Sequence, residues 1–193
     1  MLHRRLVWWA AFFACLAPAA LLSTRFDDPG FTANPMPEVI RSSGLWSLRI
    51  LLAVLLLPRI VPALASLRRM VGLWAAAYAA LHLVAWARYY RFDWVFLLDE
   101  AVMRLYLTIG SLGVLILALL AATSYDAAHR WLGTAGWRRL HLAIYPAAIA
   151  GYVHAALALR MGRNETVLYG ALLAIALVWR LHRGVISSTP PAA

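Results

Sequence analysis

Three histidines lie inside apolar stretches that are long enough to cross a membrane. These are His82, His141 and His154, and the last two share the stretch RRLHLAIYPAAIAGYVHAALALR at 138–160. Ionisable side chains at membrane depth are costly unless they face the interior of a helix bundle and find partners there. A single such ring is as easily a hydrogen-bonded contact to a neighbouring helix. Three of them indicate a functional site.

The positions of His82 and His154 predict that these two rings lie at the same depth. At a rise of 1.5 Å per residue, His82 lies roughly 18 Å along a helix that begins near Met70, and His154 roughly 21 Å along one that begins near Leu140. Two neutral imidazoles facing each other across a bundle are what six-coordinate haem iron requires. Zinc requires four ligands, and no cysteine or carboxylate lies at that depth. The residues therefore favour haem.

His141 indicates a second site about 20 Å below this pair, level with Arg68 at the beginning of the third apolar stretch. The guanidinium of Arg68 or Arg69 would pair with haem propionates there. Arginines at this position are equally typical of any inner helix end. On one ideal helix, a separation of 13 residues also turns His154 about 140° away from His141, so both rings face the same way only if Pro146 kinks the helix.

The elements that must position these rings are helices that span a membrane. The chain has 193 residues, of which 64% are hydrophobic and only 13% charged, and this composition is typical of a polytopic membrane protein. A spanning helix needs about 20 mostly apolar residues. The sequence therefore predicts an all-α membrane protein, a six-helix bundle forming one domain over 1–193, with helices at about 6–22, 44–64, 70–87, 104–123, 140–159 and 166–181.

Charge sets the expected orientation and excludes nucleic acid as a partner. All 18 basic residues are arginines scattered at the ends of apolar stretches, with no basic cluster interleaved with stacking aromatics. Placing both termini in the cytoplasm puts a small majority of the arginines inside and every acid except Asp126 outside, which favours N-in/C-in.

The segment 23–43 is typical of a loop outside the membrane. The first apolar stretch also has the pattern of a secretory signal peptide, and both interpretations keep the remaining helices in this orientation.

Three segments carry a resemblance to a known family: RRMVGLWAAAYAALHL, YLTIGSLGVLILALLAATS and WRRLHLAIYPAAIAGYVH. They are similar to the MsrQ (YedZ) haem-binding membrane subunits of the MsrPQ methionine sulfoxide reductase systems. That family lies within the wider ferric reductase-like transmembrane group, which includes the NADPH oxidases. In the oxidases the third and fifth helices each supply two histidines to two stacked haems. Here the third helix has only His82, and Arg68 stands where the other would be.

The resemblance implies an electron-transfer subunit of the bacterial inner membrane rather than the substrate-reducing enzyme itself. Such proteins take electrons from a quinone or a cytoplasmic flavin reductase and pass them through haem b to a periplasmic molybdopterin enzyme, and FMN binding is attributed to them as well. One haem or two are expected here. The chain has no GxGxxG motif, so a partner must supply the reducing equivalents. The candidate site residues are His82, His154, His141, Arg68 and Arg69.

Other functions and contacts stay open at this point. Histidines in a membrane also serve proton or ion transporters, but the predicted spans hold no buried acid to complete a relay. The arginine-rich segment 124–139 can receive an acidic flavoprotein or a flavin phosphate, or can simply reflect membrane topology. The segments 23–43 and 88–100 are candidates for docking a periplasmic partner. Haem content separates an electron relay from a transporter.

Overall fold

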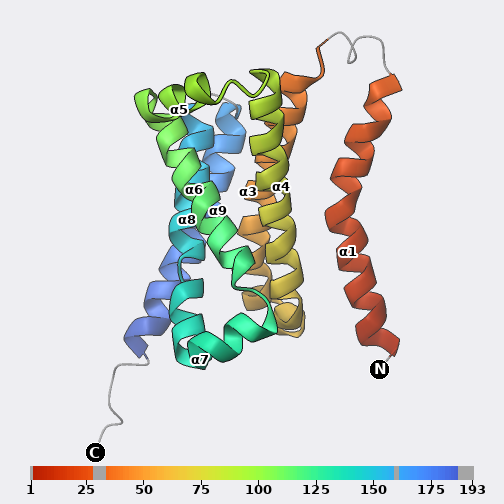
Figure 1. Ribbon diagram of the computed structural model, residues 1–193. Coiled ribbons are helices and arrows are strands. Elements are labelled where there is room, and N and C mark those ends of the chain that lie inside the picture. Colours follow the sequence, from red (N-terminus) through yellow and green to blue (C-terminus); the bar gives the residue numbers. More distant parts are fainter. Residues whose placement is uncertain (1, 28–33, 159–160, 187–193) are drawn as a thin grey trace, which may run out of the picture.

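The structure, a computed structural model, describes residues 2–27, 34–158 and 161–186, and within these ranges it holds helices and no strands. Six of its segments are long and apolar enough to cross a membrane, so the predicted all-α, six-span fold is confirmed (Figure 1). Four of the spans centre on the helices α1 (Leu2–Ser23), α3 (Met36–Ile60), α6 (Leu105–Ala122) and α9 (Arg163–Ile186). The third span combines the 3-10 helix η2 (Pro62–Leu67) with α4 (Arg68–Tyr89), and the fifth combines α7 (Asp126–His141) with α8 (Ile144–Leu157). A second 3-10 helix, η1 (Thr24–Asp27), follows α1.

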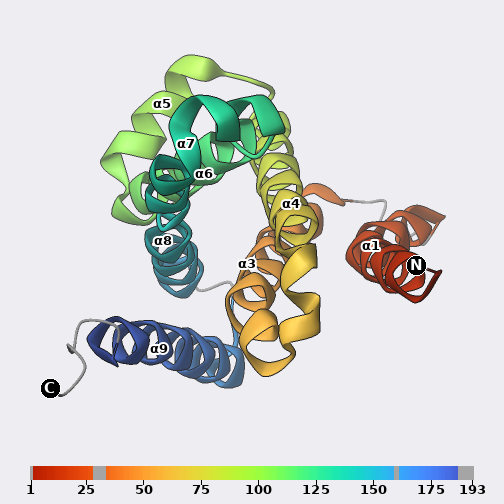
Figure 2. The same ribbon diagram turned by 90° about the horizontal axis from the view of Figure 1, so that it is seen from below.

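Four helices close into a ring, and this ring positions the histidines. α3 packs against α4, α6 against α8, α4 against α6, and α3 against α8. Figure 2 shows this ring from below, with α9 beside it and α1 on its far side. The largest group of buried apolar side chains comes from α3, which contributes Leu48, Leu51 and Leu55 among others. Close van der Waals packing between the helices holds the ring together, since lipid is as apolar as these side chains.

α1 contacts the ring at α3 and α4, and Tyr78 of α4 bonds to its backbone. The Tyr78 hydroxyl donates to the Cys15 carbonyl oxygen at 2.9 Å and accepts from the Ala19 amide nitrogen at 3.0 Å. The amide of Ala19 needs an acceptor beyond its own helix here because Pro18 interrupts α1. Phe12 adds an edge contact to Trp74, with ring centroids 5.3 Å apart.

α3 begins earlier than predicted, so the interpretation of 23–43 as a loop is wrong from Met36 onward. Pro35 stands at the N-cap, and Pro37 and Glu38 lie in the first turn. Proline is tolerated there because the first amide groups of a helix have no intrahelical partner, and an acidic residue stabilises the positive end of the helix dipole. Pro35 and Pro37 are therefore part of a helix start.

Two further helices were not predicted, and both lie at the ends of the bundle (Figure 1). α5 (Trp94–Met103) is too short to span a membrane, and the Asp93 side chain caps it by accepting from the Phe96 amide at 3.1 Å. α7 (Asp126–His141) occupies the segment interpreted as an arginine-rich loop. We call these two ends the α5 end and the α7 end. α3 and α9 begin at the α5 end, and α4 and α8 finish there.

The predicted fifth helix is broken between His141 and His154. α7 ends at His141, two residues connect it to α8, and α8 begins at Ile144. Pro146 lies in the first turn of α8, where its missing N–H breaks no intrahelical bond. Leu142 and Ala143 keep right-handed helical φ/ψ values, and 126–157 forms one candidate span that carries both histidines. The distorted turn between them means that the 140° rotation of an ideal helix does not apply.

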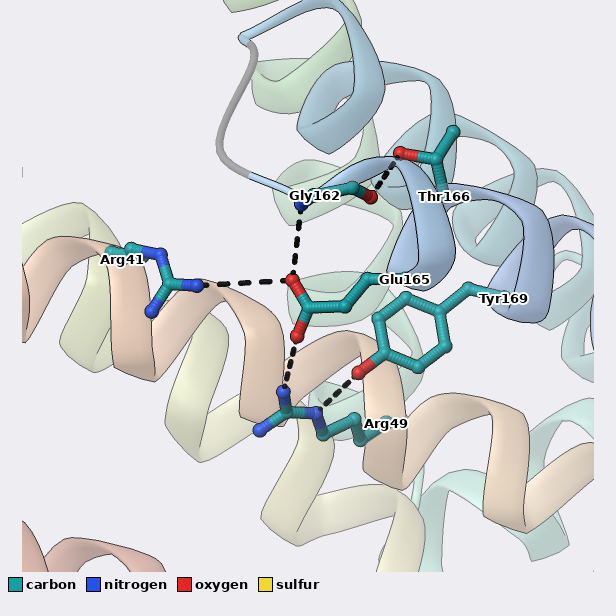
Figure 3. Close-up of polar contacts among 6 residues, drawn as sticks. All are labelled: Arg41, Arg49, Gly162, Glu165, Thr166 and Tyr169. Atoms are coloured by element: carbon teal, nitrogen blue, oxygen red, sulfur yellow. Dashed lines mark hydrogen bonds and ion pairs between the residues drawn. The ribbon is translucent and has the colours of Figure 1, made fainter.

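A charged layer near the α5 end joins α9 to α3 (Figure 3). The Glu165 carboxylate lies 3.2 Å from Arg49 and 3.7 Å from Arg41, and it accepts from the Gly162 amide at 3.3 Å. Arg49 also donates to the Tyr169 hydroxyl at 2.7 Å. The carboxylate and both arginines are only partly exposed. Partly buried charges in a membrane protein need partners, and these three side chains supply one another with them.

Candidate functional site

The structure brings His82 of α4 and His154 of α8 together inside the ring of four helices. Their ring centroids are 5.9 Å apart and their planes meet at 81°. Both side chains are half-buried. They line a cavity of about 290 Å³, whose walls come from α3, α4, α6 and α8.

Each ring is held by a backbone carbonyl of a neighbouring helix. His82 Nδ1 lies 2.8 Å from the Ile40 carbonyl oxygen of α3, and His154 Nδ1 lies 2.6 Å from the Tyr106 carbonyl oxygen of α6. A carbonyl oxygen only accepts hydrogen bonds, so Nδ1 carries the proton in both rings. The lone pair that can bind a metal is therefore on Nε2 of each histidine.

Two glycines make these close contacts possible. A Cβ atom added to Gly44 of α3 would lie 2.8 Å from His82 Nδ1, and one added to Gly110 of α6 would lie 2.5 Å from His154 Nδ1. Both distances are below what carbon and nitrogen atoms tolerate without a shift of the ring. Any other residue type at either position would displace the histidine.

The pair fits the axial ligation of a haem. A metal–imidazole nitrogen bond is about 2 Å and a ring nitrogen lies about 1 Å from its ring centre, so rings on opposite sides of one metal have centroids about 6 Å apart. The observed 5.9 Å agrees with this spacing. Within the described residues no three His, Cys, Asp or Glu side chains gather as a metal-binding group. A two-nitrogen donor set between apolar walls suits a flat macrocycle better than a bare ion.

The rim of the cavity carries aromatic side chains and Arg41, one of the two arginines beside Glu165. Tyr106 lies beside His154 with ring centroids 5.9 Å apart and planes at 30°. Trp86 and Tyr89 of α4 also line the cavity. Arg41 lines it too, and places a cation where the carboxylates of a porphyrin can reach it.

The remaining predicted site residues lie at the α7 end. His141 stacks on Trp137, with ring centroids 3.7 Å apart, and its Nδ1 donates to the Trp137 carbonyl oxygen at 3.1 Å. Its Nε2 lies 3.5 Å from the Ser124 hydroxyl. Arg69 donates to Asp126 at 2.6 Å, and Arg68 is exposed at the beginning of α4. None of these three predicted residues lines the cavity of His82 and His154.

Gly133 explains how His141 returns to the end of α6. Its φ of 67° and ψ of 161° interrupt the helical conformation inside α7. This region of backbone conformation is almost restricted to glycine. The turn lets Trp137 donate to the Thr123 carbonyl oxygen at 2.9 Å and brings His141 beside Ser124.

Sequence reasoning missed the carbonyl acceptors of Ile40 and Tyr106 and the role of Gly44 and Gly110. A carbonyl group is present at every residue, so the residue types at 40 and 106 carry no signal. The one signal in the residue types is that Gly44 and Gly110 interrupt apolar helices, since a glycine inside a helix often has a packing reason.

A comparison with known families identifies the class of membrane protein to which this bundle belongs. The family model described as "Ferric reductase like transmembrane component" matches residues 43–152, more than half of the chain, so this is a ferric reductase-like transmembrane protein.

Similar proteins identify the family within this class to which the chain belongs. The chain is 36% identical to the "Protein-methionine-sulfoxide reductase heme-binding subunit MsrQ" of Caulobacter vibrioides over 95% of this chain and 90% of that protein. It is 35% identical to the protein of that name from Rhodospirillum rubrum over 89% and 86%, and 37% identical to that from Bordetella pertussis over 88% and 86%. The chain belongs to the MsrQ family, which confirms the resemblance found in its sequence. No solved structure matches it.

Proposed function

We propose that this chain is the haem-binding, electron-transfer subunit of a protein-methionine-sulfoxide reductase system. The observation that carries the proposal is the pair His82 and His154, 5.9 Å apart between four helices, with both Nδ1 atoms bound to backbone carbonyls. The names of the relatives, which describe haem-binding subunits, agree with it.

The residues of the chain have distinct tasks in this proposal. His82 and His154 would hold the iron through Nε2, and the Ile40 and Tyr106 carbonyl groups keep the two rings in place. When bound, haem supplies an iron that takes up and gives up single electrons. Two histidine ligands would keep small molecules from the metal. Arg41 lines the cavity and would pair with a propionate there, and Glu165 lies 3.7 Å from this arginine.

The proposed orientation places the α5 end toward the periplasm and both termini in the cytoplasm of a bacterial cell, in its inner membrane. The support is the distribution of charge, since this orientation places ten of the 18 arginines on the cytoplasmic side and every acid except Asp126 on the outer side. The histidine pair then lies nearer the outer face, where a periplasmic molybdopterin reductase similar to MsrP would accept electrons. α5 and the segment before it would form its docking surface.

The electron donor would bind at the α7 end. Arg130, Arg138 and Arg139 of α7 are exposed, and the Trp131 side chain is 85% exposed. An exposed tryptophan among arginines is typical of a membrane–water interface. A quinone in the membrane or an acidic cytoplasmic flavin reductase can approach this surface, and the arginines also suit the phosphate of FMN.

A second haem at His141, with Arg68 or Arg69 at its propionates, stays a prediction. In its favour, Nδ1 of His141 donates to a carbonyl, as in the other two histidines, so its lone pair is on Nε2. Against it, Trp137 covers one face of the ring and Asp126 pairs with Arg69.

The decisive experiment measures haem in the purified protein. We expect the pyridine haemochrome assay to give stoichiometric haem b, and the oxidised protein to have the spectrum of a low-spin, bis-histidine iron. Reduction of this haem by a quinol or by a flavin reductase, followed by its oxidation by a molybdopterin partner, tests the direction of electron flow. A protein that folds, incorporates no haem when haem is supplied, and moves protons in vesicles would be a transporter instead.

A further inference from the structure

The two histidines are held by the same arrangement on two different helices. On α3, the Ile40 carbonyl accepts from His82 and Gly44 follows four residues later. On α6, the Tyr106 carbonyl accepts from His154 and Gly110 again follows four residues later. Each glycine is also the residue whose added Cβ would meet the histidine Nδ1.

Helix geometry gives a physical reason for the spacing of four. In an α-helix the carbonyl of residue i accepts the amide of residue i+4 and keeps a second lone pair. The Cα–Cβ bonds tilt toward the N-terminus of the helix, so the side chain of residue i+4 covers the turn that contains this carbonyl. A glycine at i+4 removes that cover. The carbonyl oxygen then becomes open to a donor from a neighbouring helix. On α3 the Ile40 oxygen accepts from His82 Nδ1 at 2.8 Å, beside a longer contact of 3.2 Å from the Ser43 hydroxyl of its own helix.

We propose that Gly44 and Gly110 are positioning residues of the haem site, which uncover the Ile40 and Tyr106 carbonyls for the Nδ1–H groups of His82 and His154. The inference rests on the proposed haem function. A carbonyl that accepts from Nδ1–H fixes the tautomer and the ring orientation and makes Nε2 a stronger base. Stronger ligand bases favour ferric iron over ferrous iron, so the two glycines hold the midpoint potential of the site low.

Other glycines of the chain provide matched controls. Gly136 of α7 does not line the cavity, and its added Cβ would meet the Leu132 Cβ at 3.8 Å, an ordinary contact. Gly72 of α4 has nothing within 4 Å of such a Cβ. Alanine at these two positions tests helix propensity and packing without touching a histidine.

The first experiment compares Gly44→Ala and Gly110→Ala with Gly136→Ala and Gly72→Ala. We expect the first two to raise the midpoint potential of the haem and to change its low-spin electron paramagnetic resonance signal, because the rings rotate and lose their carbonyl acceptors. The two controls should keep the potential and the signal of the unchanged protein. Equal potentials in all four variants would overturn the proposal.

A second experiment does not depend on whether the glycine variants fold. In His154→Gly, the missing ring leaves a space beside the Tyr106 carbonyl that an added imidazole can fill. The probes are 4-methylimidazole and 1-methylimidazole, which are isomers. When each binds iron, only 4-methylimidazole keeps an N–H to donate to the carbonyl. A hydrogen bond of ordinary strength predicts that it binds roughly two- to tenfold more tightly, after reference to the affinities of both isomers for haem in detergent.

The outcomes separate the inference from the function on which it rests. Absence of haem from the unchanged protein, with haem supplied, would remove the proposed function itself. Stoichiometric haem together with equal referenced affinities of the two isomers would leave that function standing and overturn the role of the carbonyl and its glycine.

Discussion

Histidines at both ends of the bundle donate to backbone carbonyls, but the carbonyl belongs to another helix at the α5 end and to the same helix at the α7 end. At the α5 end, His82 and His154 each donate to a carbonyl of another helix. At the α7 end, His141 donates to the Trp137 carbonyl, four residues earlier in its own helix. A bond within one helix fixes a ring only relative to that helix. A bond between helices fixes both helices around the ring, which is what a shared cofactor site requires.

The largest expected effect is the loss of haem when a residue of the pair is replaced. His82→Ala and His154→Ala should each abolish the low-spin spectrum, because one axial nitrogen is removed from the iron. His141→Ala should keep that spectrum, since His141 does not line the same cavity. Absorption and electron paramagnetic resonance spectra of the purified variants measure both outcomes.

His182→Ala is the matched control, because His182 is exposed on α9. Total haem in His141→Ala also decides the second site: a loss of part of the haem with the low-spin pair intact would establish a haem at the α7 end. Retention of the bis-histidine spectrum in both His82→Ala and His154→Ala would remove the ligand assignment.

The sequence was sufficient for the six spans and for placing His82 and His154 at one level. Both inferences use only hydrophobic length and the fixed rise of a helix, and they are insensitive to errors of a few residues. The segment around His141 is different, because a rotation argument there requires an unbroken helix. The break before Ile144 is set by local backbone conformation, which hydropathy does not report.

Other features were out of reach for physical reasons. The carbonyls of Ile40 and Tyr106 act through the backbone, so no residue type signals them. α5 and α7 lie at the ends of the bundle and need no continuous apolar run of spanning length. Glu165 was assigned to the outer side, but its two arginine partners come from α3, more than a hundred residues earlier. Such pairings follow from tertiary packing alone.

The next largest effect concerns the turn at the α7 end. Gly133→Ala places a side chain at φ 67° and ψ 161°, a conformation that costs other residues of order 1–3 kcal/mol. We expect a lower midpoint of thermal unfolding in detergent and no change in the low-spin spectrum of the α5 end. Gly136→Ala is the control, since its added Cβ would meet only the Leu132 Cβ at 3.8 Å. A changed low-spin spectrum in Gly133→Ala alone would show that the two ends are coupled.

A smaller effect is expected from the charged layer that joins α9 to α3. Glu165→Gln leaves Arg41 and Arg49 facing a neutral amide, and since these groups are about one third exposed, we expect a loss of about 1 kcal/mol in the free energy of unfolding. Asp99→Asn is the control, because Asp99 is exposed in the middle of α5 and away from both helix ends. Thermal unfolding of both variants measures the difference. Equal stability of the two would mean that Glu165 does not hold α9 in place.

The smallest effect is expected at the exposed ion pair of the α7 end, and it bears on whether that end holds a cofactor. Asp126→Asn releases Arg69, whose side chain is 51% exposed in the pair. Exposed pairs contribute little and are screened by salt, so any loss of thermal stability should disappear at high ionic strength. If the α7 end is only an interfacial surface, haem content stays unchanged. If Asp126→Asn instead gains haem, and Asp126→Asn/His141→Ala does not, then Asp126 competes with a haem propionate for Arg69. In that case both ends of the bundle are haem sites, and the site at the α7 end is kept empty by Asp126.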